Sequence, residues 1–241
     1  MDTKRNVETI VSSTPISSQN MISPKVVRII RLALAFLIVI TIVYRIAFSW
    51  NKDIPVLIYF TVQSNLACAA LWFIKGFGPK IKIPQVSFYI TTYIAITGAV
   101  FLFVLDRGFT TIIYEKLESG SIEDYVHYYA LMVSMVAHYI VPLLAVMDFL
   151  LFTDNKAIRI EGKVLIYPLC YLGMALLFTW KSGKYVYPFL DPDFVGGSAV
   201  VALIAVGLLL VFLLVHKGLY LWNRKVQKGI ENYYKKLSLG T

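Results

Sequence analysis

The chain has 241 residues, of which 58% are hydrophobic, 15% aromatic and only 15% charged. Soluble domains contain about 45–50% apolar and about 25% charged residues, so this composition excludes an ordinary soluble fold. The mean hydropathy of +0.70 also excludes a disordered chain, because apolar residues at this density do not stay solvated. The composition therefore predicts a membrane protein.

Long unbroken apolar runs predict transmembrane helices rather than the strands of a barrel. Barrel strands alternate apolar and polar residues over about ten positions, whereas the runs at 32–43 and 199–215 show no such alternation. About 20 apolar residues cross the hydrocarbon core of a bilayer. The sequence predicts an all-α bundle of six spans, at 29–48, 54–74, 83–105, 125–152, 164–180 and 198–215.

The net charge of +9 is explained by the position of the basic residues and does not require a nucleic-acid partner. Of the 23 Lys and Arg residues, 17 precede residue 32, follow residue 216, or lie in the second and fourth connections between spans. The positive-inside rule then predicts that both termini are cytoplasmic and that the protein is a multi-pass protein of the plasma membrane. The acid-rich segment 106–124 is accordingly expected to be an external loop.

The predicted domain organisation is a transmembrane domain between two tails. Residues 1–24, rich in Ser and Thr, are expected to form a disordered cytoplasmic tail, 25–222 the transmembrane domain, and 223–241 a basic cytoplasmic tail. Basic residues mixed with Tyr and Trp are typical of a helix lying on anionic lipid headgroups, and an ordinary extension of the last helix is the alternative. No spacing of Cys and His fits a metal site, so neither a metal nor another cofactor is expected.

Polar residues inside predicted spans are the first candidates for a functional site, because polar groups in hydrocarbon are costly. Thr61, Ser64 and Asn65 share one face of the second span. They are expected either to form part of a functional site or to make hydrogen bonds between helices. His138 lies near the middle of the fourth span, and His127 on the same face near its outer end. Centring the spans places Thr61 and His138 at similar depth, which is the minimal geometry for a hydroxyl nucleophile and a general base.

Three other polar residues lie near the ends of predicted spans. They are Arg45 in the first span, Asp148 in the fourth and His216 at the end of the sixth. Side chains at such positions reach the membrane interface, so each is expected to be a boundary residue.

Three short segments, in order along the chain, resemble one family of membrane proteins. They read FTVQSNL at 60–66, HYIVPL at 138–143 and GKYVYPFLD at 183–191. Each is similar to a motif of the androgen-induced and androgen-dependent TFPI-regulating proteins, in particular their bacterial relatives. The resemblance extends over nearly the whole of residues 29–222.

The resemblance implies an intramembrane hydrolase that cleaves fatty acid esters of hydroxy fatty acids, with Thr61 as nucleophile and His138 as its base. Gln63, Ser64 and Asn65 are candidates to stabilise the oxyanion, and Asn65 is preferred because it shares the face of Thr61. A membrane lipid or fatty-acyl ester is the expected partner. The alternative is a non-enzymatic six-helix transporter or a solute- or lipid-binding membrane protein, in which the same polar residues bind a solute.

Overall fold

The computed structural model describes residues 23–48, 53–78, 81–105 and 133–239, and within these ranges the chain is helical and contains no strand. The acid-rich segment 106–124, His127 and residues 1–22 of the predicted N-terminal tail lie outside the described residues. The α-helices are α1 (Pro24–Ala47), α2 (Phe60–Phe77), α3 (Pro84–Val100), α6 (Val141–Phe152), α7 (Ile166–Ser182), α8 (Pro192–Val195) and α9 (Ser198–Leu239). Two π-helical turns, η3 (Phe101–Leu105) and η4 (Val136–Ile140), extend α3 and precede α6. Short 3-10 turns occupy Val56–Ile58, Asn155–Ala157, Gly162–Leu165 and Pro188–Leu190.

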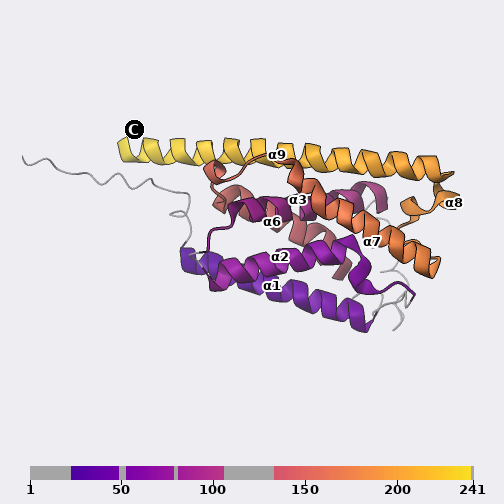
Figure 1. Ribbon diagram of the computed structural model, residues 1–241. Coiled ribbons are helices and arrows are strands. Elements are labelled where there is room, and N and C mark those ends of the chain that lie inside the picture. Colours follow the sequence, from indigo (N-terminus) through magenta and orange to yellow (C-terminus); the bar gives the residue numbers. More distant parts are fainter. Residues whose placement is uncertain (1–22, 49–52, 79–80, 106–132, 240–241) are drawn as a thin grey trace, which may run out of the picture.

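The long helices run roughly parallel or antiparallel to one another in a single bundle (Figure 1). Helices α1 and α2 pack together on one side, α9 covers the opposite side, and α3 and α6 lie between them. The beginning of α1 and the end of α9 lie at the same end of the bundle, whereas α8 and the start of α2 lie at the other.

Five helices in the described part of the chain are long and apolar enough to cross a membrane, which confirms an all-helical architecture suited to several membrane passages. They are Pro24–Ala47, Pro84–Phe103, Val133–Phe152, Gly162–Ser182 and Ser198–Leu237. Helix α2 is not among them, because its 18 residues include the polar stripe predicted from the sequence.

The second helix begins later than the sequence predicted. Pro55 fixes its own φ and has no N–H, and Tyr59 is extended with ψ of 132°, so a 3-10 turn precedes the helix. Helix α2 therefore starts at Phe60 instead of residue 54. As a result, Thr61 lies in the first turn of α2 and not near the middle of a span.

The buried face of α2 joins the centre of the bundle. Trp72 of α2 is 1% exposed and packs with Ala35 and Ile38 of α1, Ile94 of α3 and Val141 of α6. Burial of apolar side chains at this contact contributes about 25 cal/mol for each Å² removed from solvent. This core fixes the position of the polar residues that share the same face of α2.

A buried cluster of charges ties three helices together at the end of the bundle where α1 begins. Asp148 of α6 accepts a hydrogen bond from Arg31 Nε of α1 at 2.8 Å and lies 3.4 Å from Lys75 Nζ of α2. The three side chains are only 12–14% exposed. The expectation that Asp148 extends to the interface is therefore wrong, because its two cationic partners hold it inside the bundle.

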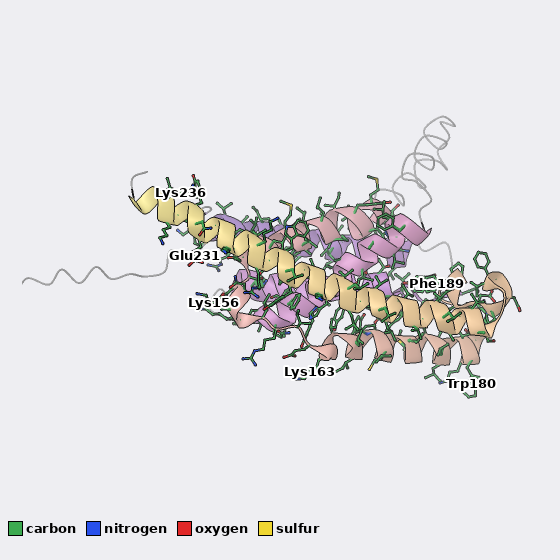
Figure 2. All side chains as sticks on the ribbon, turned by 90° about the horizontal axis from the view of Figure 1, so that it is seen from above. Lys156, Lys163, Trp180, Phe189, Glu231 and Lys236 are labelled. Carbon is green, nitrogen blue, oxygen red and sulfur yellow. The ribbon has the colours of Figure 1, made fainter. Side chains whose placement is uncertain are left out.

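Helix α9 is longer than a membrane is thick. Its 42 residues correspond to about 63 Å at 1.5 Å per residue, roughly twice the hydrocarbon thickness. Figure 2 shows α9 running the length of the molecule, with Lys236 near its far end and Trp180 of α7 pointing outward at the other. The helix continues without a break through position 222, so the predicted basic tail begins inside it.

Candidate functional site

Thr61 lies in the first turn of α2, and two tyrosine hydroxyls contact the N-terminus of this helix. The Phe60 N–H donates to the hydroxyl of Tyr171 at 3.2 Å and to that of Tyr187 at 3.1 Å. The Tyr187 hydroxyl also hydrogen bonds the Thr61 side chain. Because the first N–H groups of a helix have no partner within it, they leave a positive partial charge at this position. The Thr61 side chain, on a residue only 8% exposed, is thus paired with the Tyr187 hydroxyl at the positive end of α2.

The segment after α7 positions Tyr187 beside the N-terminus of α2. Helix α7 ends at Gly183, whose φ of +68° is left-handed and favours glycine, so the chain can turn back sharply. Val186 and Leu190 are then buried, at 4% exposure each, against the rest of the bundle. The Tyr187 ring stacks on Phe189 with centroids 5.0 Å apart, which fixes the direction of its hydroxyl.

Burial raises the pKa of the Tyr187 hydroxyl above its ordinary value of 10.0, although hydrogen bonds from Thr61, Tyr171 and Phe60 partly oppose the shift. The hydroxyl therefore stays protonated at neutral pH. A protonated phenol donates a hydrogen bond, so Tyr187 is suited to stabilise negative charge on a neighbouring oxygen.

An apolar cavity of about 100 Å³ opens at Thr61, between α2, α3, α7 and α9. Thr61 and Tyr187 are among the hydroxyl-bearing residues that line it. The remaining wall is mostly hydrocarbon and aromatic, from Phe60, Ile96, Thr97, Val100, Pro168, Tyr171, Leu172, Phe189, Leu190, Ala205, Leu208, Leu209 and Phe212. A mostly apolar cavity with hydroxyl groups in its lining is suited to a short hydrocarbon segment next to a polar group.

A second, much smaller void of about 10 Å³ lies between α1, α2 and η4. Its lining includes Thr41 and Arg45 of α1, Thr61 and Asn65 of α2, and Ala137 of η4. Thr61 therefore forms part of the wall of both spaces.

His138 lies in the π-helical turn η4 and is 6% exposed. Its ring stacks on Phe101 with centroids 3.8 Å apart, and Nδ1 lies 2.7 Å from the carbonyl oxygen of Ser134. A carbonyl only accepts hydrogen bonds, so Nδ1 carries the proton and Nε2 is the basic nitrogen. Pro142, four residues later, has no N–H to offer the His138 carbonyl, which accounts for irregular helix at this point.

Asn65 connects the backbone at Thr61 to the backbone beside His138. Its Nδ2 donates to the Thr61 carbonyl at 2.8 Å and to the Ala137 carbonyl at 3.1 Å. The structure thus brings the two predicted segments into contact. The Thr61 hydroxyl is directed to Tyr187, however, and His138 lines neither cavity.

The three residues predicted to stabilise an oxyanion use their hydrogen-bond donors within the fold. The two amide hydrogens of Asn65 serve the carbonyls just named, and Ser64 Oγ lies 3.0 Å from the Thr61 carbonyl and 2.8 Å from the Thr97 hydroxyl. Gln63 Nε2 donates to the Leu57 carbonyl at 3.0 Å. These contacts correspond to the alternative of hydrogen bonding between and within helices.

The two tyrosines whose hydroxyls accept from the Phe60 N–H were not predicted individually. Tyr187 belongs to the 183–191 segment that carries the family resemblance, so a signal for it was present. Tyr171 lies within an apolar span and carries no sequence signal of its own. His216, expected at the interface, is 0% exposed and pairs with the Thr92 hydroxyl at 2.9 Å. The described residues contain no group of three His, Cys, Asp or Glu side chains that could hold a metal ion.

Comparisons with protein families, with curated proteins and with solved structures find no match for this chain.

Proposed function

We propose that this chain is a lipid-ester hydrolase of the plasma membrane, with six spans, both termini in the cytoplasm and Thr61 as its nucleophile. The proposed substrates are fatty acid esters of hydroxy fatty acids and similar acyl esters. One observation carries the proposal: the buried Thr61 side chain hydrogen bonds the Tyr187 hydroxyl and lines a mostly apolar cavity.

In the proposed reaction, the part of the acyl chain next to the ester occupies the apolar cavity and the ester carbonyl lies against Thr61. The Thr61 oxygen attacks the carbonyl carbon while its proton passes to Nε2 of His138. We expect the contact between these two side chains to form when substrate fills the site, because catalytic hydrogen bonds are often long without substrate. Asn65 supports this contact by holding the Thr61 and Ala137 carbonyls.

The tetrahedral intermediate carries its negative charge on the former carbonyl oxygen. The protonated hydroxyls of Tyr187 and Tyr171, together with the positive end of α2, supply donors for that charge. Collapse of the intermediate breaks the ester C–O bond, and His138 returns its proton to the leaving alcohol. Water then hydrolyses the threonyl ester, with His138 again accepting a proton.

The test is covalent labelling of the full chain in detergent by a fluorophosphonate probe, together with hydrolysis of a fatty acid ester of a hydroxy fatty acid. Thr61→Ala and His138→Ala are expected to abolish both signals, whereas Thr61→Ser retains a hydroxyl and part of the activity. Thr92→Ala is the matched control, because Thr92 is also buried but lines neither cavity. Unchanged labelling in Thr61→Ala, or none in the wild type, would exclude the threonine mechanism and favour the non-enzymatic alternative.

A further inference from the structure

The apolar cavity beside Thr61 is lined by interior helices on one side and by peripheral helices on the other. Helices α2 and α3 pack on each other inside the bundle, and Ile96 of α3, which lines the cavity, is only 2% exposed. Helices α7 and α9 line the other side, and only 22% and 6% of the residues in their apolar segments are buried. The two peripheral helices therefore lie between the cavity and the surrounding bilayer.

Helices α7 and α9 diverge where they line the cavity. Val164, just before α7, belongs to the same buried cluster as Phe212 of α9, so the two helices lie close together there. From this point they move apart toward the end of the bundle that holds α8 (Figure 1). Leu172 of α7 and Ala205 of α9 line the cavity within this stretch, and we call the space between these two residues the α7–α9 gap.

The surfaces on either side of the α7–α9 gap are suited to contact hydrocarbon. Leu169 of α7 is 47% exposed, and Val206, next to Ala205 on α9, is 56% exposed. Neither 164–180 nor 198–215 contains a charged residue. Segments of this composition lie at the depth of the lipid acyl chains, so the gap faces lipid and not the aqueous phase.

The size of the cavity requires most of a long acyl chain to lie outside it. A volume of about 100 Å³ holds only a short hydrocarbon segment. The remainder of the chain must leave the cavity while the ester is next to Thr61. Because α2 and α3 close the interior side, the path that keeps the chain in hydrocarbon runs between α7 and α9.

We propose that the α7–α9 gap is the entrance through which an acyl chain passes from the bilayer to Thr61, and that Ala205 keeps this entrance open. Ala205 carries only a methyl group, whereas the other residues of α9 that line the cavity are Leu208, Leu209 and Phe212. A large side chain at position 205 would fill the space that the acyl chain occupies. The inference rests on the proposed function for its catalytic readout, whereas entry of an acyl chain is tested without turnover.

The labelling experiment uses the full chain carrying Thr61→Ala, in phosphatidylcholine nanodiscs that contain a fatty acid methyl ester with a diazirine close to its carbonyl. Irradiation should label Ile96, which lipid outside the bundle does not reach, as well as the exposed Leu169. Ala205→Trp should reduce the label on Ile96 about 10-fold and leave that on Leu169 unchanged. Ala202→Trp is the matched control, because Ala202 is an exposed residue of the same helix and lies outside the cavity lining.

The labelling results can overturn the proposal in two ways. Absence of label on Ile96 in the Thr61→Ala protein would show that acyl chains do not enter, whatever Ala205→Trp does to the fold. Equal labelling of Ile96 in the Ala205→Trp and Ala202→Trp variants would exclude the α7–α9 gap as the path. Leu208→Ala changes the same wall in the opposite direction, and we expect it to increase the label on Ile96; a decrease would contradict the proposal.

The hydrolysis experiment separates this proposal from the proposed function. With Thr61 intact, Ala205→Trp should lower kcat/KM for a long-chain acyl ester by about 10- to 100-fold relative to Ala202→Trp, as expected when a pocket for hydrocarbon changes shape. Hydrolysis that depends on Thr61 but is unchanged by Ala205→Trp would refute the entrance and leave the hydrolase. Labelling of Ile96 that Ala205→Trp blocks, without hydrolysis that depends on Thr61, would refute the hydrolase and leave the lipid entrance.

Discussion

Asp148 is the single anion of the buried charge cluster, so its neutralisation should destabilise the bundle more than the loss of any exposed carboxylate. In Asp148→Asn, the Arg31 and Lys75 charges stay inside the bundle, where their side chains are 14% and 13% exposed. Removing one partner of a buried pair costs about 3–5 kcal/mol, because the remaining charge is not compensated. At about 2–4 °C per kcal/mol for a chain of this size, the melting temperature should fall by roughly 6–20 °C.

The matched control is Asp53→Asn, which breaks an ion pair of the same length at the surface. Asp53 and Lys184 are 66% and 45% exposed, and such pairs contribute only about 0–1 kcal/mol. Thermal unfolding of both variants in the same detergent, followed by intrinsic fluorescence, gives the comparison. Equal shifts in the two variants would refute the reasoning, since burial would then have no effect on the cost of losing the carboxylate.

Three further predictions follow from individual contacts. Gly98→Ala places a Cβ 2.9 Å from Pro142 Cβ and should lower stability by about 1–3 kcal/mol in thermal unfolding, whereas Gly207→Ala, with open space around the added carbon, should not. Tyr187→Phe removes only the hydroxyl, so we expect kcat on a lipid ester to fall about 100- to 1,000-fold; the Phe60 N–H keeps the Tyr171 hydroxyl as an acceptor, so the melting temperature should fall by no more than a few degrees. Asn223→Leu leaves the two carbonyls that its side chain caps at the end of α6 without that donor, and should cost about 1–3 kcal/mol in the same melting assay.

The part of the site on α2 could be predicted because its signal is local. A run of polar residues at helical spacing within an apolar segment requires burial against other helices, and Thr61, Ser64 and Asn65 are all buried in the structure. The same reasoning identified His138. The predicted start of α2 was too early because the apolar run extends through Pro55. Proline has no backbone N–H, and a hydropathy pattern contains no information about backbone hydrogen bonds.

The groups around Thr61 could not be found in this way, because they come from distant parts of the chain. Tyr171 and Tyr187 reach the Phe60 N–H from 111 and 127 residues away. Arg45 and Asp148 were both read as boundary residues, since each lies near the end of an apolar run. Whether either residue forms an ion pair inside the bundle depends on which side chains the neighbouring helices place at the same depth.

By itself, the sequence determined that the protein is all-helical and suited to a membrane. Apolar runs of this length must form helices in lipid, because a helix satisfies its own backbone hydrogen bonds. It also determined which face of α2 is buried. Only the tertiary structure decided that Thr61 lies at a helix N-terminus beneath two tyrosines, that Asp148 is shared by two cations, and that Arg45 lacks an acid among the described residues. Helix formation is governed by local hydropathy and hydrogen bonding, whereas the partner of each polar side chain is fixed by the packing of helices far apart in the chain.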